Sequence, residues 1–220
     1  MIAYLDLTSL TGQETEEDVV ALCRKAHTPK GDVAAVCVYG EWAGVCAREL
    51  DTIAVAAVAN FPAGDRDAER ARRESAQAVA AGAREIDVVL PWRAWLAGDR
   101  EGALEVVAAA RGEAPVLKVI LESAQLGDRV KEAARDALQA GADFVKTSTG
   151  KAGPGATPEA ARAMLEAVRE HGSGGLKASG GVRTVAQARE YLDLAVEHLG
   201  EVGPDRFRIG ASGLLDELLK

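Results

Sequence analysis

The chain has 220 residues and a formal net charge of −8, with 26 basic residues against 34 acidic ones. The basic residues are scattered, which argues against a nucleic-acid-binding surface. No apolar run is long enough to cross a bilayer, so we expect no membrane contact. Aromatic residues make up only 4% of the chain, which predicts a core of small aliphatic side chains.

The cysteines and the first residues bear on the cellular compartment. Cys23, Cys37 and Cys46 lack the spacing of metal ligands, and their odd number argues against a disulfide framework. Residues 1–6 lack the basic lead and apolar core of a signal peptide. We therefore expect a soluble protein of a reducing compartment, the cytoplasm.

Short apolar runs alternate with helical segments along the whole chain. The runs are apolar throughout, as expected for strands of a parallel sheet that is covered on both faces. Strands are predicted at 3–8, 33–39, 53–59, 85–90, 116–122, 143–146, 175–178 and 206–210.

Helices are predicted between these strands from their capping residues and their composition. Thr15 precedes three acids and is a suitable N-cap. Thr157 caps a later helix, with Pro158 at its first position. The predicted helices cover 15–26, 42–50, 65–82, a segment from 92, 100–110, 128–140, a segment from 157, 185–199 and 214–219.

Eight strands that alternate with helices predict a (β/α)₈ barrel, the TIM barrel, as a single domain over residues 1–220. An open, doubly wound sheet is the competing fold. It fits less well because no glycine-rich nucleotide fingerprint follows the first strand. The segment 149–151 is not a P-loop either, since Val145 stands where that motif needs glycine.

Five of the predicted strands carry a charged residue in apolar surroundings. In a barrel, catalytic groups come from the C-terminal ends of several strands. Two acids and three bases inside one barrel could instead form a purely structural network of ion pairs. The five residues are Asp6, Asp87, Lys118, Lys146 and Lys177.

Lys146 and Lys177 each end an apolar run and precede a turn that contains glycine. Burial disfavours an ammonium group, and a second ammonium nearby lowers the pKa further. A neutral lysine amine is a nucleophile that forms Schiff bases with carbonyl compounds. Either lysine alone could extend to solvent, but the pair on successive strands favours catalysis.

Glycine-rich turns follow the last two strands, at Gly180-Gly181 and at Gly210-Ala211-Ser212. Barrels commonly bind phosphate at this place through backbone N–H groups. Either turn alone could be an ordinary tight turn. Together with the lysines, the turns indicate an imine-forming lyase or aldolase that acts on a small phosphorylated carbonyl compound.

At these motifs the chain resembles the deoxyribose-phosphate aldolase family. The segments that carry the resemblance are Lys-Thr-Ser-Thr-Gly at 146–150, Lys-Ala-Ser-Gly-Gly-Val-Arg at 177–183, Glu-Ile-Asp-Val-Val at 85–89 and Leu-Lys-Val-Ile-Leu-Glu at 117–122. Shorter matches at residues 6–8, 37–39, 60–62 and 210–212 follow in family order, so the resemblance covers nearly the whole chain.

The resemblance implies reversible cleavage of 2-deoxy-D-ribose 5-phosphate to D-glyceraldehyde 3-phosphate and acetaldehyde, without a metal or a cofactor. It implies that Lys146 forms the imine, that Lys177 lowers its pKa and that Asp87 moves protons through a water molecule. Asp6 and Lys118 would support this group of residues, and Cys37 would lie near the substrate. A homodimer is expected at the level of the family.

The resemblance also implies a phosphate site, formed by Gly150, Lys151, Gly180, Gly181, Gly210 and Ser212. Gly213 stands where many relatives have a second serine, which weakens the expected phosphate contact. The last residues, Leu218-Leu219-Lys220, include no tyrosine of the kind that assists proton transfer in some members. The first strand is predicted close to Met1, without the additional helix that usually closes the bottom of the barrel.

Two alternatives remain open at this stage. One is a Schiff-base barrel for a different sugar phosphate or aldehyde, which residues such as Asn60 and Gly213 would decide. The other is a barrel that binds a sugar phosphate without catalysis. The presence of Lys146, Lys177 and Asp87 argues against this second alternative.

Overall fold

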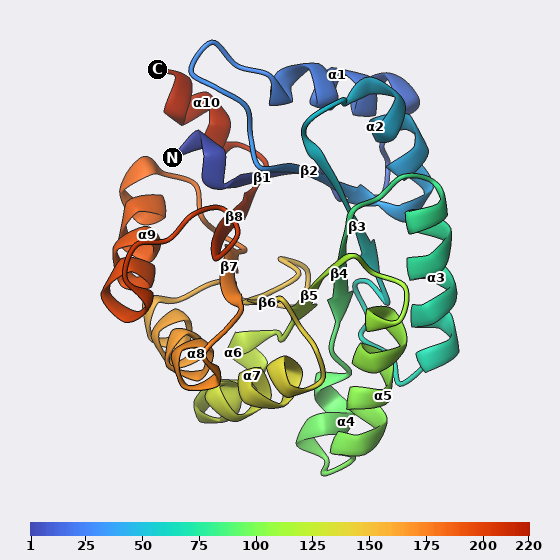
Figure 1. Ribbon diagram of the computed structural model, residues 1–220, viewed down its shortest axis with the longest axis vertical. Helices are drawn as coiled ribbons and strands as arrows, with labels where there is room; N and C mark the ends of the chain where they lie inside the picture. The colour runs from blue at the N-terminus through green and yellow to red at the C-terminus, as the bar shows by residue number, and fades with distance from the viewer.

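The computed structural model describes all residues, 1–220, and its centre is a closed barrel of eight strands (Figure 1). Each strand pairs in parallel with its neighbours in the chain, and β1 pairs with β8 to close the ring. The predicted (β/α)₈ barrel is confirmed.

All eight predicted strands form, most within one or two residues of the expected bounds. The strands are β1 (Leu5–Thr8), β2 (Ala35–Tyr39), β3 (Ala54–Ala59), β4 (Glu85–Val89), β5 (Val116–Ile120), β6 (Phe144–Lys146), β7 (Gly175–Ser179) and β8 (Phe207–Ala211).

The first strand begins later than the sequence predicts. Residues Ile2–Tyr4 form a short 3₁₀ helix, η1, and β1 starts at Leu5. The Tyr4 ring packs on Phe207 with ring centres 5.9 Å apart, and its hydroxyl donates to the Val202 carbonyl at 2.8 Å. These contacts turn the chain against β8 before the strand begins.

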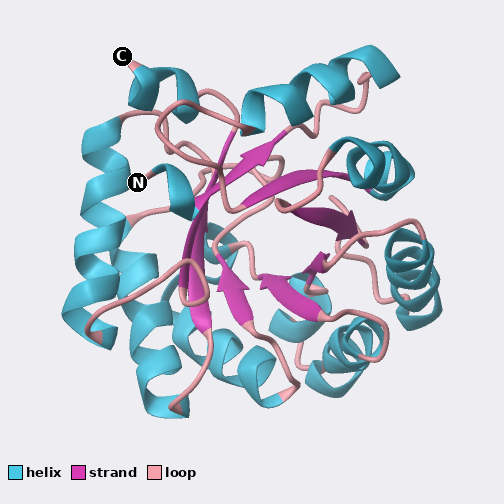
Figure 2. Cartoon of the chain, turned by 45° about the horizontal axis from the view of Figure 1, so that its top comes forward, coloured by secondary structure: helices cyan, strands magenta, loops and turns pink.

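A ring of helices surrounds the barrel, as Figure 2 shows. Both chain termini lie beside α10 in this view and in Figure 1. The helices are α1 (Glu16–Ala26), η2 (Gly40–Trp42), α2 (Ala43–Glu49), α3 (Ala68–Ala80), α4 (Trp92–Leu96), α5 (Arg100–Arg111), α6 (Ser123–Leu126), η3 (Gly127–Arg129), α7 (Val130–Gln139), α8 (Pro158–His171), α9 (Val185–Leu199) and α10 (Leu214–Leu219).

The predicted caps form, and a further cap explains a shifted boundary. Thr15 and Asp18 make a capping box at α1, and Thr157 caps α8. Helix α3 starts at Ala68 rather than at residue 65, because Asp67 accepts the Arg70 N–H and so becomes the N-cap.

The core consists mainly of aliphatic side chains, as the composition predicts, with a few aromatic ones such as Trp95 and Phe207. A large cluster fills the layer between the strands and the helices. A second, smaller cluster lies inside the barrel and comes mostly from β2 to β5, with Ala35, Cys37, Ala56, Val58, Val89 and Ile120 among its members. Apolar packing therefore fills only part of the interior, and the rest is charged.

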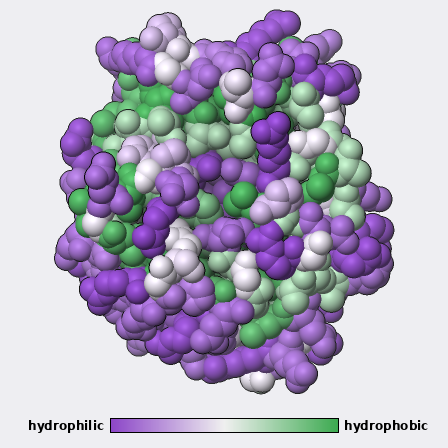
Figure 3. Space-filling view, viewed as in Figure 1, coloured by the Kyte–Doolittle hydropathy of each residue, from purple (hydrophilic) through white to green (hydrophobic).

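Figure 3 shows one face of the molecule, on which hydrophilic residues gather mainly round the rim and hydrophobic residues lie between them, most of all in the upper part of the view. Val196 is the only large hydrophobic residue that is exposed, at 46%. No helix combines the length and the hydropathy that a membrane span requires.

Candidate active site

The alternation of the strands places every second residue inside the barrel. The register pairs Lys146 of β6 with Lys177 of β7, and Lys177 with Arg208 of β8. It also pairs Asp87 of β4 with Lys118 of β5. Basic and acidic side chains from distant parts of the sequence therefore meet in one layer of the interior.

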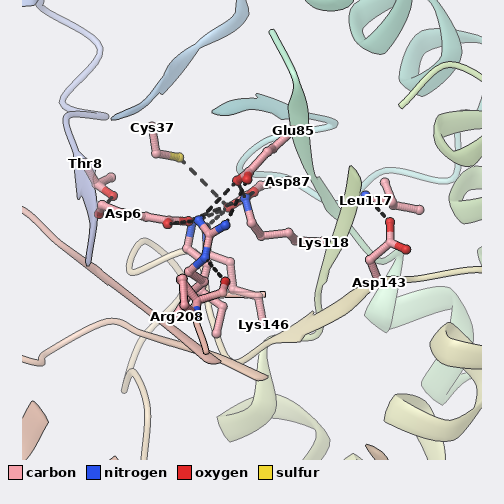
Figure 4. A network of polar contacts seen from close by, with 12 residues as sticks. Asp6, Thr8, Cys37, Glu85, Asp87, Leu117, Lys118, Asp143, Lys146 and Arg208 are labelled. Atoms are coloured by element: carbon pink, nitrogen blue, oxygen red, sulfur yellow. Dashed lines mark hydrogen bonds and ion pairs between the residues drawn. The ribbon is translucent and has the colours of Figure 1, made fainter. Parts of the chain in front are cut away.

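Asp87 lies at the centre of this group (Figure 4). Its Oδ2 accepts hydrogen bonds from Lys146 Nζ at 2.8 Å and from Lys177 Nζ at 2.7 Å. Its Oδ1 accepts from Lys118 Nζ at 2.9 Å. The structure thus brings together the three residues that the sequence proposes as catalytic.

Asp6 is a second carboxylate partner of Lys177, with one oxygen 2.5 Å from its Nζ. The same oxygen lies 3.4 Å from Lys118 Nζ. The other oxygen of Asp6 accepts from Arg208 at 2.7 Å. Asp6 and Asp87 therefore hold Lys177 between them, and neither carboxylate is exposed.

Sequence reasoning missed two members of the group, Glu85 and Arg208. Arg208 donates to Glu85 Oε1 at 3.1 Å, and Lys118 Nζ forms a short ion pair with Glu85 Oε2. Both residues could have been found from the period of two, because Glu85 precedes Asp87 by two residues and Arg208 precedes Gly210 by two.

The two central lysines have opposite pKa shifts. Burial lowers the pKa of Lys146, and Lys177 lowers it further, while Asp87 opposes both. Burial also acts to lower the pKa of Lys177, but Asp6 and Asp87 outweigh it and raise that pKa well above its usual value. Lys146 is therefore the amine that more readily becomes neutral.

The buried carboxylates stay ionised because of the cations around them. Burial acts to raise the pKa of Asp87, yet Lys118, Lys146 and Lys177 hold it well below its usual range. Burial opposes ionisation of Asp6 in the same way, and Lys177, Lys118 and Arg208 lower its pKa.

Cys37 lies at the edge of this cluster. Its Sγ is 3.9 Å from Asp87 Oδ2, and the residue has no exposed surface. Burial raises the pKa of its thiol. The neutral thiol therefore packs against the charged group and is not activated as a nucleophile.

A cavity of about 380 Å³ opens above the cluster. All six residues of the expected phosphate site line it, as does Lys146. Sequence reasoning missed other lining residues, namely Thr8, Ser9, Leu10, Thr11, Ser148, Thr149, Ser179, Val182, Arg183 and Ala211.

The remaining site residues lie beneath the cavity rather than on its wall. Asp6, Cys37, Asp87, Lys118 and Lys177 are all fully buried and do not line it. Lys146 is the only member of the charged cluster with access to the cavity. A small molecule in the cavity would therefore meet the amine of Lys146 first.

The two residues expected to decide the substrate have different positions. Gly213 lines the cavity, whereas Asn60 does not. The Asn60 side chain is buried and donates to the carbonyls of Asp65 and Val89, so it holds its own loop in place.

The cavity wall is basic although the whole chain is acidic. Lys146, Lys151 and Arg183 line it, and no aspartate or glutamate does. Two loops form much of this wall, and hydrogen bonds from Thr147 and Ser148 to the Ser179 carbonyl, each 2.8 Å, join them. These features suit an anion.

Glycine is required at two points of the wall. Gly180 has a φ of +86°, and a Cβ there would collide with Ser148 Oγ and lie 2.8 Å from the Gly155 Cα. A Cβ on Gly210 would lie 2.5 Å from Ser179 Oγ and 3.0 Å from Lys177 Cε. Both positions keep the backbone open to a ligand and leave room for the lysine beneath.

The described side chains form no group of three or more His, Cys, Asp and Glu residues with the geometry to hold a metal ion. The chemistry available on the cavity wall is that of an amine, several hydroxyl groups, two further cations and the glycine turns.

A closed barrel in which a low-pKa lysine faces a cavity is typical of lyases that act on carbonyl compounds. A model of the DeoC/LacD family of aldolases matches residues 1–219, and the chain belongs to this family. It is therefore a lyase of the aldolase type.

Solved structures agree with this assignment. The aldolase QR15 is 28% identical, with a TM-score of 0.87 over 99% of this chain and 95% of its own. The tetrameric deoxyribose phosphate aldolase of Aeropyrum pernix is 27% identical, with a TM-score of 0.81 over 100% of this chain and 91% of its own. A provisionally assigned deoxyribose-phosphate aldolase of Coccidioides immitis is 29% identical, with a TM-score of 0.86 over 100% and 85%.

Proposed function

We propose that this chain is a deoxyribose-phosphate aldolase, which cleaves 2-deoxy-D-ribose 5-phosphate reversibly to D-glyceraldehyde 3-phosphate and acetaldehyde. The observation that carries the proposal is the position of Lys146. It is the one residue of the buried charged cluster that lines the cavity, and its pKa is lowered by burial and by Lys177.

The reaction begins with the neutral amine of Lys146, which attacks the C1 aldehyde and forms a carbinolamine. Loss of water gives the iminium ion. A base then removes the proton of the C3 hydroxyl, the C3 oxygen becomes a carbonyl and the C2–C3 bond breaks, which releases D-glyceraldehyde 3-phosphate. The electron pair of the broken bond forms the C1=C2 double bond of an enamine, and the iminium π pair returns to the nitrogen. Protonation at C2 and hydrolysis release acetaldehyde and restore the amine.

Lys177 and Asp87 are proposed to support these steps from beneath. Lys177 stays protonated between two carboxylates, so its charge disfavours an ammonium on Lys146. Asp87 lies 2.8 Å from Lys146 Nζ and is proposed to move protons to and from the carbinolamine through a water molecule. Asp6 and Lys118 fix the position of this pair, and Cys37 fills the space beside it.

The basic end of the cavity is proposed to bind the substrate phosphate. Gly150, Lys151, Gly180, Gly181, Gly210 and Ser212 line it together. The phosphate would then lie at the glycine turns with the aldehyde directed to Lys146. The printed names of the Aeropyrum pernix and Coccidioides immitis proteins support this choice of substrate.

The proposal includes a cytoplasmic enzyme that acts without a metal or a cofactor and assembles as a homodimer. The similarity of the motifs to deoxyribose-phosphate aldolases supports each of these points. The Aeropyrum pernix relative is described as a tetramer, so measurement of the molar mass in solution decides the assembly.

Borohydride trapping in the presence of acetaldehyde tests the proposal. A reduced two-carbon adduct on Lys146 alone, located by intact mass and peptide mapping, would support the imine mechanism. Lys151 lines the same cavity and serves as the internal comparison. Adducts spread over surface lysines, or none at all, would refute the assignment of Lys146 as an activated amine.

A further inference from the structure

Seven ionisable side chains lie together inside the barrel, and their charges do not cancel. Three are carboxylates and four are cations. The side chain of Arg208, the most exposed of them, is still nine-tenths buried. With all seven ionised, the interior carries one surplus positive charge. The seven residues are Asp6, Glu85, Asp87, Lys118, Lys146, Lys177 and Arg208.

The contacts identify which cation is the surplus one. Lys118 lies within 3.4 Å of all three carboxylates. Lys177 contacts two of them, Asp6 and Asp87. Lys146 contacts Asp87 alone.

Arg208 also contacts two carboxylates, Asp6 and Glu85. Lys146 is thus the cation with the fewest carboxylate partners, and it is also the one that faces the cavity. Loss of its proton leaves three cations against three carboxylates.

We propose that Arg208 and Glu85 are positioning residues that act on the charge of Lys146 in opposite directions. Arg208 supplies the third cation that matches the three carboxylates while Lys146 is neutral, and Glu85 supplies the third carboxylate and so limits this effect. The role in catalysis rests on the proposed function, since only an imine-forming enzyme needs this amine. Neither residue lines the cavity, so both act through Lys118, Asp6 and Asp87 rather than on the substrate.

The linkage from Glu85 and Arg208 to Lys146 is short and continuous (Figure 4). Glu85 pairs with Lys118, which donates to Asp87 Oδ1, and Asp87 Oδ2 accepts from Lys146. Arg208 pairs with Asp6, which contacts Lys177. These side chains are buried, and a unit charge acts more strongly over such distances there than it does in water.

A contribution to stability alone does not explain why Glu85 and Arg208 form a buried ion pair here. Buried ion pairs are often no more stable than apolar side chains of similar size, because the desolvation cost offsets the attraction. The neighbouring part of the interior is in fact filled by apolar residues. Opposite effects of Arg208 and Glu85 on the charge of Lys146 give these two residues a role that packing does not.

The charged and titratable groups around Lys146 come from several strands and from the two loops of the cavity wall. They are Asp6 of β1, Cys37 of β2, Glu85 and Asp87 of β4, Lys118 of β5, Lys177 of β7, Arg208 of β8, and Lys151 and Arg183 on the cavity wall.

The charge count predicts shifts of opposite sign for two substitutions. In Arg208→Gln, three carboxylates face three lysines, so a protonated Lys146 completes the balance and becomes neutral only at higher pH. In Glu85→Gln, two carboxylates face three other cations, so a protonated Lys146 is disfavoured further. The double variant restores the balance and returns Lys146 to its original behaviour.

Competitive labelling measures the protonation of Lys146 in each variant without relying on aldolase activity. Trace acetic anhydride acylates neutral amines, and the rate at Lys146 is followed from about pH 5 to 11 by peptide mass spectrometry, with Lys151 as the internal reference. We expect the midpoint for Lys146 to move up by about one pH unit in Arg208→Gln and down by a similar amount in Glu85→Gln.

Arg206→Gln is the matched control, because Arg206 lies next to β8, donates to the Gly174 carbonyl and is outside the charged cluster. It should leave the midpoint unchanged. Circular dichroism and thermal unfolding confirm that each variant folds. If Arg208→Gln does not fold, Glu85→Gln and the double variant still test the proposal. The double variant removes both members of the Arg208–Glu85 ion pair, so neither is left without the other.

Shifts of the same sign in the two single variants, or unchanged midpoints in folded protein, would overturn the proposal, as would a double variant that behaves like either single one. Failure of the aldolase assignment would appear separately. In that case the labelling midpoint of Lys146 still moves up in Arg208→Gln and down in Glu85→Gln, but Lys146 forms no adduct with acetaldehyde and borohydride.

Discussion

Lys146 and Lys177 donate to the same oxygen of Asp87, at 2.8 and 2.7 Å, yet their pKa values move in opposite directions. The difference comes from their second partners. Lys177 has Asp6 at 2.5 Å, whereas Lys146 has only the cavity. Asp87 Oδ2 therefore holds the Lys177 ammonium beside the Lys146 amine, which can become neutral.

Lys146→Arg should reduce aldolase activity to background. The guanidinium group keeps the positive charge but cannot form an imine at neutral pH. Turnover of 2-deoxy-D-ribose 5-phosphate, coupled to detection of acetaldehyde, measures the effect. Lys131→Arg on the surface of α7 is the control and should retain full activity, since Lys131 only pairs there with Glu166 and Glu170. Residual turnover above background would remove the catalytic role from Lys146.

Lys177→Leu should move the pH profile of kcat/KM to higher pH. The reaction needs neutral Lys146, and the Lys177 charge lowers the pKa of Lys146, so loss of that charge raises this pKa. We expect activity to fall about tenfold or more at pH 7 and to recover partly in alkaline solution. A profile with an unchanged acid limb would show that Lys177 has another role.

The fold could be predicted from the sequence because its determinants are local. Apolar runs, helix caps and glycine turns recur in regular order, and the barrel follows from their number. The predicted strands at 3–8, 33–39 and 116–122 are each two residues too long, and the first of them shows why. The residues before Leu5 are apolar enough for a strand, but contacts of Tyr4 with Phe207 and Val202, about 200 positions away, turn them into a 3₁₀ helix.

The site could be predicted in part. Lys146, Lys177 and Asp87 stand out because each is a charged residue next to apolar ones in a predicted strand, and because each belongs to a motif that resembles the aldolase family. Arg208 was overlooked because it follows another arginine, Arg206, and resembles a solvent-exposed strand end. Glu85 was overlooked because it begins its strand. Only the closed barrel shows that both point inward, where Arg208 reaches Glu85 from the far end of the chain.

Stability should decline as the solution is made acidic. The pKa values of Asp6 and Asp87 lie below their usual range in the folded protein, so the unfolded chain binds protons first. Their contribution is present above about pH 4 and is lost as the pH falls through the folded values. Urea unfolding at a series of pH values between 7 and 2 measures the free energy of unfolding.

Asp6→Asn provides the comparison for this acid dependence. The variant should be less stable at pH 7, because Lys177 and Arg208 each lose a charged partner. Its stability should also change less between pH 5 and 2 than that of the original chain. Equal slopes in the two proteins would mean that Asp6 does not carry the acid dependence.

Gly180→Ala should weaken binding of the phosphorylated substrate. The backbone there has a φ of +86°, and the new Cβ would meet Ser148 and the backbone of Gly155, which lie in the adjoining loop. That loop would have to move, and the phosphate site with it. We expect KM for 2-deoxy-D-ribose 5-phosphate to rise at least severalfold and kcat/KM for unphosphorylated 2-deoxyribose to change little.

Gly172→Ala separates the loss of the phosphate site from backbone strain. Gly172 has a nearly equal φ of +85°, but it ends α8 and has no atom within 4 Å of the new Cβ. Both variants should lose about 1 kcal/mol or more of stability from the left-handed backbone. Only Gly180→Ala should discriminate between the two substrates, because only Gly180 lines the cavity. A similar loss with both substrates would place the phosphate elsewhere.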